Sequence, residues 1–237
     1  MNIFNRVALQ GLRKSRTRTI VTVIGVVLSS AMITAVATFA VSLQNYMVND
    51  AIARYGNWHV EFYDVSPSFA EEQTQSKGVA SAASIENIGY ADLEGGKNPD
   101  KPYLFITGFR KEASDALPIH LTSGRLPENS GEILIPAHVA ANGGVTFSIG
   151  ETLSLAVGTR MGAGRTLGQH DPYVSGDGSG ASGETFAPKA DKTYTIVGIC
   201  ERPGFEESSA PGYTLITTAD PQQAADGITV FLTLQNK

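Results

Sequence analysis

The sequence predicts an α+β chain: one N-terminal transmembrane helix with an extracytoplasmic stalk, then a mixed α/β extracytoplasmic domain rich in hairpins. Four observations predict this. Residues 20–43 contain no charged side chain, five Lys and Arg residues precede them, and no Asp or Glu occurs before Asp50. Beyond residue 56, short stretches of alternating apolar and polar residues are separated by Gly, Pro and Asn, as in hairpin strands.

The uncharged segment, residues 20–43, is long enough to cross a membrane. At the rise of an α-helix its 24 residues span about 36 Å, more than the roughly 30 Å of a bilayer core. The basic residues before it are Arg6, Arg13, Lys14, Arg16 and Arg18. Because cytoplasmic flanks carry such an excess of positive charge, we expect residues 1–19 to be a cytoplasmic, basic, amphipathic segment of a plasma or inner membrane protein.

A cleavable signal peptide is the competing interpretation of the same segment. Ala35, Val36 and Ala37 resemble a cleavage site that follows an apolar stretch. However, the tail before the apolar stretch is long for a signal peptide, and the apolar character continues past this site to Leu43. We therefore predict a retained membrane helix.

Small and hydroxylated residues recur along the predicted span. They are Gly25, Ser29, Ser30, Ala31, Thr34, Ala35, Thr38 and Ser42. Such residues let membrane helices approach closely and hydrogen-bond to each other, so we predict that they face other membrane helices. The alternative is that the hydroxyl groups hydrogen-bond to the backbone of their own helix.

The helix is expected to continue as a stalk over residues 44–56, where Gly56 would end it. Residues 57–237 then form the extracytoplasmic domain. A short helix is predicted to begin at Pro67, behind the cap residue Ser66, and another to cover residues 136–141. Strands are predicted over residues 59–65, 84–93, 103–109, 132–135, 147–157, 194–199, 213–217 and 228–234.

Residues 158–192 break this pattern. They contain eight glycines and few large apolar residues, so they bury little surface to offset the entropy lost on ordering. The composition predicts a flexible, Gly-rich insertion on a hairpin.

Several function classes are excluded or disfavoured. The part of the chain after residue 18 carries a net charge of −10, which does not suit nucleic acid. Cys200 is the only cysteine, and the four histidines (His59, His120, His138 and His170) lack the spacing of a metal site, so surface or capping roles are expected for them.

No catalytic motif is present either. A GxGxxG match at residues 178–183 lies in the predicted insertion, without the strand and helix that phosphate binding requires. Glu201, Glu206 and Glu207 are expected to form a solvated acidic loop. No P-loop, HExxH or GxSxG motif occurs, so we expect no enzyme activity, no cofactor and no metal.

A set of short motifs occurs in a characteristic order: G-R-x-P, G-E-I-x-I, I-G-E-x-L and Y-x-I-V-G-I, after a basic tail and an uncharged helix. The matching residues are Gly124, Arg125, Pro127, Gly131, Glu132, Ile133, Ile135, Gly150, Glu151, Leu153, Val197 and Gly198. In this order they resemble an ABC transporter permease of the MacB/FtsX type with a MacB-like periplasmic core domain. Structural roles are expected for Gly124, Arg125, Pro127, Gly131, Glu132 and Gly150, because Gly permits positive φ and Pro fixes φ in tight turns.

The resemblance implies the permease subunit of such a transporter, dimeric, with four membrane helices, of which this sequence contains the first. It also implies a separate cytoplasmic ATPase whose hydrolysis of ATP moves the extracytoplasmic domain for export or mechanotransmission. The expected partners are therefore this ATPase, the remaining permease helices, a second permease and the lipid bilayer. The alternative hypothesis is a single-span, membrane-anchored binding or adhesion module that works alone.

Overall fold

The structure is a computed structural model that describes residues 15–110, 113, 116–176, 183–220 and 227–235. It separates into two compact units, Met1–Ala51 and Ile52–Lys237, and each is described by itself. We call the second the β unit. Most of the basic segment predicted at residues 1–19 lies outside the described residues.

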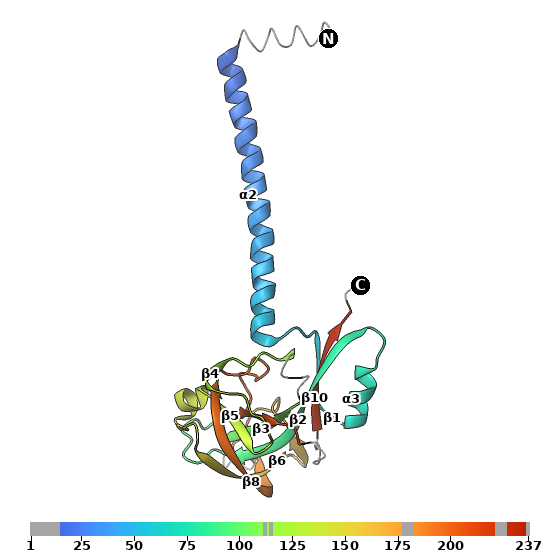
Figure 1. Ribbon diagram of the computed structural model, residues 1–237, viewed down its shortest axis with the longest axis vertical. Helices are drawn as coiled ribbons and strands as arrows, with labels where there is room; N and C mark the ends of the chain where they lie inside the picture. The colour runs from blue at the N-terminus through green and yellow to red at the C-terminus, as the bar shows by residue number, and fades with distance from the viewer. Residues whose placement is uncertain (1–14, 111–112, 114–115, 177–182, 221–226, 236–237) are drawn as a thin grey trace. The chain divides into compact units, whose positions relative to one another are not determined.

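One helix, α2 (Arg16–Tyr55), covers the predicted span and the predicted stalk (Figure 1). Its most apolar window has a mean hydropathy of 2.3, and none of its residues is buried, so it is a candidate membrane span by length and composition. Gly56 follows with φ +97°, and its N–H donates to the carbonyl of Ile52. Glycine ends the helix here because it adopts a left-handed conformation without strain.

The first elements of the β unit follow the predicted pattern. Strand β1 (Val60–Val65) precedes α3 (Pro67–Thr74), whose cap residue Ser66 accepts a hydrogen bond from the N–H of Phe69. The remaining strands are β2 (Val79–Asp92), β3 (Tyr103–Phe109), β4 (Leu121–Gly124), β5 (Glu132–Pro136), β6 (Thr152–Gly162), β7 (Arg165–Leu167), β8 (Thr185–Cys200), β9 (Gly212–Thr218) and β10 (Gly227–Leu234).

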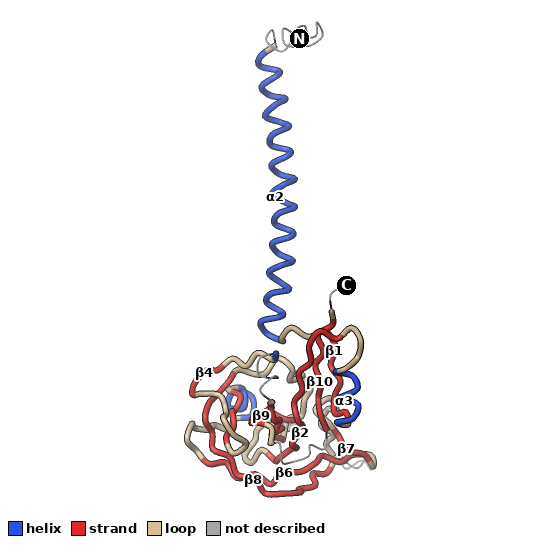
Figure 2. Tube along the Cα trace, turned by 45° about the vertical axis from the view of Figure 1, so that its right-hand side comes forward, coloured by secondary structure: helices blue, strands red, loops and turns tan. Residues whose placement is uncertain are grey.

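These strands form one sheet in the order β1-β10-β2-β3-β9-β5-β8-β6-β7, with β4 paired to β8. Two pairs, β3–β9 and β5–β8, are parallel, and the others are antiparallel. Because Tyr90 of β2 also pairs with Gly158 of β6, the six strands from β2 to β6 in this order close into a ring. Figure 2 shows the strands curving around a common centre, with α3 beside β1 and β10.

The main core fills this ring with side chains from all six of its strands. It contains Ala91, Leu93, Leu104, Ile106, Ile133, Ile135, Leu155, Val157, Tyr194, Ile196, Tyr213 and Leu215, together with Val139. On the other side of the sheet Ala83, Ile85, Phe109, Leu134, Ile216 and Phe231 form a second core. The mixed helix and strand architecture confirms the predicted α+β class with one candidate span.

The range predicted as a flexible, Gly-rich insertion on a hairpin, residues 158–192, contains strands over 16 of its 35 residues. Residues 158–162 continue β6, residues 165–167 form β7, and residues 185–192 are the first half of β8. The physical reason is a buried charge, Arg160, and close backbone pairing between β6 and β8, which a search for apolar periodicity does not detect. The GxGxxG match at residues 178–183 lies almost entirely outside the described residues.

Two smaller predictions are corrected. The helix expected at residues 136–141 is a single wide turn, η1 (Val139–Gly143), which Gly144 ends with φ +73°. The strand expected at residues 147–157 begins only at Thr152, because Gly150 takes φ +90° in the turn before it.

Candidate functional site

The chain enters the β unit through residues 52–59, which we call the junction segment. It contains the last turn of α2, Gly56 and Trp58, and all of it belongs to the β unit. The indole Nε1 of Trp58 donates to the carbonyl of Tyr55 at 2.7 Å. The ring Nε2 of His120 lies 3.0 Å from the carbonyl oxygen of Ala53. These two hydrogen bonds hold the carbonyl end of the helix, which has no partners within the helix itself.

Gly56 is required at this position for two reasons. Its φ of +97° is disfavoured for other residues, and a Cβ atom there would lie 2.6 Å from the carbonyl oxygen of Ala116. The chain therefore turns from α2 toward β1 in a conformation fixed by packing.

Trp58 connects the junction segment to the core of the β unit. Its ring meets Phe231 of β10 edge to face, with centroids 5.3 Å apart. Phe205 lies between Phe231 and Phe109 of β3, at 6.1 Å and 5.8 Å. Contacts of this kind have the geometry that aromatic pairs prefer, so displacement of the junction segment would be resisted by two strands and by the loop that carries Phe205.

That loop, residues 201–210, also reaches the end of α2. A Cβ atom at Gly204 would clash with the carbonyl of Arg54, so only glycine allows the two backbones to approach this closely. The loop is in turn fixed by Glu206, whose side chain is fully buried.

Glu206 contacts two cationic side chains, one histidine and one backbone group. Its Oε1 lies 2.8 Å from Nζ of Lys101, 2.8 Å from Nε2 of His138 and 3.2 Å from Nε of Arg202. Its Oε2 accepts from the N–H of Thr214 at 2.7 Å. A buried carboxylate is tolerated only when it is paired and hydrogen-bonded in this way.

The network controls the ionisation of its members. Burial opposes the ionisation of Glu206, but the hydrogen bond from His138 and the charge of Lys101 outweigh it and lower the pKa of Glu206 to about 2. Burial lowers the pKa of Lys101, and the neighbouring Glu206 only partly offsets this. Glu206 is thus an anion throughout the physiological range and fixes the loop beside the helix end.

The expectation of a solvated acidic loop is therefore wrong for Glu206, and a surface role is wrong for His138. His120 binds the helix end, and His59 Nδ1 accepts from the N–H of Leu234 at 3.0 Å. His170 contacts Glu207, with Nδ1 and Oε1 3.0 Å apart. Among the described residues, no three His, Cys, Asp or Glu side chains are arranged to hold a metal ion.

The family-motif residues come together around the crossing of β4, β5 and β8. Arg125 donates to both carboxylate oxygens of Glu132, at 2.6 Å and 2.7 Å, and these bonds lower the pKa of Glu132 to about 2. The N–H of Glu128 adds a third hydrogen bond to Glu132. The pair closes the connection between β4 and β5.

The glycines and the proline of the same motifs sit at turns and close approaches. Gly124 has φ +79° and lies against the backbone of Val197 and Gly198. The carbonyl of Gly131 accepts from Thr195 and the N–H of Gly150 donates to Ile196, so both attach to β8. Thr218 Oγ1 donates to the carbonyl of Pro127 at 3.4 Å. This placement accords with structural roles, which stay a prediction.

The small and hydroxylated residues of the predicted span all lie on α2 and are exposed. They are Gly25, Ser29, Ser30, Ala31, Thr34, Ala35, Thr38 and Ser42. Ser30 Oγ donates to the carbonyl of Val27 and Thr34 Oγ1 to that of Ser30, as in the alternative interpretation. Their contact with other membrane helices remains a prediction.

Sequence reasoning missed Trp58, His120 and Glu206. One signal in the sequence could have identified Trp58: the single tryptophan follows the helix-ending Gly56 by two residues, where a partly buried aromatic side chain can pack against the domain. Nothing in the sequence distinguishes Glu206 from its exposed neighbour Glu207.

Comparisons with known proteins agree with this architecture. The family described as the MacB-like periplasmic core domain matches residues 19–235, which is nearly the whole chain. No curated protein matches the sequence.

Solved structures to which this chain is similar include the following three. One is a domain of a putative permease protein from Porphyromonas gingivalis, with 15% identity, a TM-score of 0.35, and coverage of 77% of this chain and 70% of that one. Another is the extracellular domain of the noncanonic ABC-type transporter YknZ from Gram-positive bacteria, with 8% identity, a TM-score of 0.39, and coverage of 74% and 82%. The third is the periplasmic region of MacB from Actinobacillus actinomycetemcomitans, with 11% identity, a TM-score of 0.35, and coverage of 72% and 65%.

The family assignment rests on the match over residues 19–235, which runs from the apolar helix to the last described strand. The chain belongs to the family of the MacB-like periplasmic core domain, and its helix α2 is a candidate membrane span.

Proposed function

We propose that this chain transmits motion within an ABC transporter of the MacB/FtsX type, from the membrane to the β unit on the extracytoplasmic side. The N-terminus lies in the cytoplasm, α2 crosses the membrane, and a separate cytoplasmic ATPase drives the movement. The chain itself has no catalytic activity. It works with the remaining permease helices and with a second permease subunit.

The observation that supports this proposal is that the junction segment is held in place by packing and hydrogen bonds. Gly56, Trp58 and His120 fix the last turn of α2 to the β unit, and the loop held by Glu206 lies against it. A flexible linker would serve a tethered binding module equally well, whereas transmission of motion requires a stiff connection.

The orientation can be tested by cysteine labelling. Cys200 is fully buried, so a single cysteine introduced at Asn2 or at Ser68 reports alone on its side of the membrane. In intact cells an impermeant maleimide should label Ser68→Cys and should label Asn2→Cys only after lysis. Labelling of Asn2→Cys from outside would reverse the orientation.

Coupling can be tested in the assembled transporter with its ATPase. Spin labels at Ser68→Cys on the two permease subunits should change their separation when the ATPase is trapped with ATP. Insertion of Gly-Gly-Ser between Tyr55 and Gly56 should abolish this change and leave ATP hydrolysis in place. The same insertion between Gly95 and Gly96, in a turn remote in sequence from the junction segment, is the control. An unchanged response in the Tyr55–Gly56 insertion would favour the single-span binding module.

A further inference from the structure

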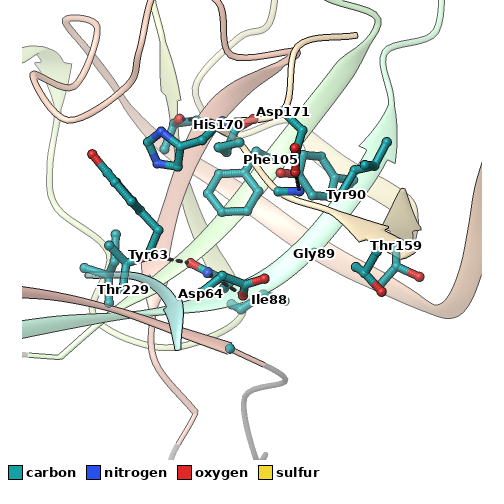
Figure 3. A pocket seen from close by; sticks show the side chains of 18 of the residues that line it. Tyr63, Asp64, Ile88, Gly89, Tyr90, Phe105, Thr159, His170, Asp171 and Thr229 are labelled. Carbon is teal, nitrogen blue, oxygen red and sulfur yellow. Dashed lines mark hydrogen bonds between the residues drawn. The ribbon is translucent and has the colours of Figure 1, made fainter. Parts of the chain in front are cut away.

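A cavity of about 580 Å³ lies inside the β unit, and nothing in the transmission of motion requires it. Its volume is in the range of pockets that hold small molecules, roughly 300–1,000 Å³. Figure 3 shows Tyr63 and His170 on one side of the cavity, Tyr90 and Thr159 on the other, and the ring of Phe105 between them.

One part of the lining is apolar and largely aromatic. It is formed by Ile85, Ile88, Tyr90, Phe105, Leu167 and Phe205. Tyr90 and Phe105 are buried, and their ring centroids are 5.0 Å apart. Flat apolar surfaces of this kind favour an aromatic body in the ligand.

The rest of the lining is polar, with five carboxylates against two cations. Asp171 is paired with Arg165, and Glu206 with Lys101. Glu61, Asp64 and Glu207 are the other three acidic residues of the lining. Its two cations are Arg165 and Lys189, and Lys189 also interacts with another residue. The electrostatic balance of the cavity therefore favours a positively charged ligand.

Glu61 faces the cavity because of its place on β1. Val60, Phe62 and Val65 of this strand pack with α3 and β10, so Glu61 and Tyr63 lie on the opposite face. Tyr63 hydrogen-bonds to Glu61 and stacks on His170, whose Nδ1 lies 3.0 Å from Oε1 of Glu207.

Tyr90 lines the cavity, but its hydroxyl oxygen is closed to solvent. The guanidinium of Arg160 lies over its ring, 5.2 Å from the centroid. Tyr90 therefore contributes aromatic surface to the cavity together with Phe105.

We propose that this cavity binds a small aromatic amine, with its ammonium group between Glu61 and Glu207 and its ring against Tyr90 and Phe105. The ammonium lies beside the carboxylates of Glu61 and Glu207, and the aromatic faces stabilise both the cation and the ring. The site requires only the β unit, and its existence does not depend on coupling to an ATPase.

The test uses the full chain in nanodiscs of zwitterionic phosphatidylcholine, with empty nanodiscs as the blank. Three probes share one ring system: 1-naphthylmethylamine, 1-naphthalenemethanol and 1-naphthoic acid. Isothermal titration at pH 8 should show the amine binding at least about tenfold more tightly than the alcohol, and the acid most weakly.

The variants Glu61→Gln and Glu207→Gln should each weaken amine binding about tenfold and leave alcohol binding unchanged. Glu94→Gln, an exposed carboxylate outside the lining, is the matched control and should bind like the parent. If Glu61→Gln fails to fold, Glu207→Gln decides alone, because its side chain is 47% exposed and its loss leaves no buried charge. Equal binding of amine and alcohol, or amine binding unchanged in Glu207→Gln, would overturn the proposal.

Discussion

Arg160 and Glu184 form a bidentate ion pair in which both side chains are fully buried. Nε of Arg160 lies 2.8 Å from Oε1 of Glu184, and Nη2 lies 2.6 Å from Oε2. The guanidinium also donates to the carbonyls of Gly168 and Asp171 and lies over the ring of Tyr90, 5.2 Å from its centroid. One side chain thus joins β6, β8 and the turn after β7.

Replacement of Glu184 by glutamine should destabilise the β unit strongly. It would leave the Arg160 cation buried without its counter-charge, and such losses cost about 3–5 kcal/mol. Thermal unfolding of the full chain in detergent, followed by the fluorescence of Trp58, measures the change. The control Glu128→Gln removes an exposed carboxylate and should shift the free energy of unfolding by less than about 0.5 kcal/mol. A Glu184→Gln chain as stable as the control would contradict the role of this pair.

Glu206 should make the free energy of unfolding of the β unit depend on pH below about 4.5. Its pKa in the folded state is lowered to about 2 from an ordinary value of 4.5, so its stabilising contribution is complete above pH 4.5 and is lost as pH falls toward 2. Glu206→Gln should be less stable than the parent at pH 7 by about 3 kcal/mol, and the difference should shrink below pH 4.5. A difference that stays constant from pH 7 to pH 3 would show that the ionised form of Glu206 is not what stabilises the loop.

Glu61 should give the stability of the β unit the opposite dependence on pH to that given by Glu206. Burial, together with the nearby Glu207, raises its pKa to about 7, although a hydrogen bond from Tyr63 partly opposes this. The folded state therefore holds this proton more tightly, and the stability gained is complete below pH 4.5 and is lost as pH rises through 7. Glu61→Gln, which cannot ionise, should melt close to the parent at pH 5 and above it at pH 8.5. If the parent chain melted at a higher temperature than Glu61→Gln at pH 8.5, the predicted direction of the pH dependence would be wrong.

The packing prediction for α2 can be tested at Gly25. No atom lies within 4 Å of the position where a Cβ would stand, so leucine fits without strain in the isolated chain. Gly25→Leu should still insert in the membrane, but it should reduce co-purification with the other permease helices, because close helix approach requires a small residue. Val26→Leu keeps the apolar character of the span and serves as the control. Equal recovery of both variants would contradict packing of α2 against other membrane helices at Gly25. It would favour the alternative, in which Ser30 and Thr34 hydrogen-bond only within their own helix.

The features that could be predicted from the sequence are those that produce a local pattern of apolar, polar and turn residues. The uncharged helix, the cap at Ser66, and strands β1, β3, β9 and β10 follow from hydropathy and turn residues. The ring closure does not, because it depends on Gly89 and Gly158 allowing two backbones to meet, which no local pattern encodes. Arg160 and Glu206 were missed for a related reason: a charged side chain is buried only when its partners, distant in sequence, gather around it.

The pairing of β1 with β10 has a consequence for how the β unit can fold. Val60 faces Leu232, and the N–H of His59 donates to the carbonyl of Leu232, so the first strand of the unit is completed only by its last. In a chain that folds in sequence order, β1 has no partner strand until about 170 further residues are available. Meanwhile β1 offers free backbone groups to any neighbouring strand. A longer delay between β1 and β10 would therefore lengthen the time in which β1 can pair with a wrong strand.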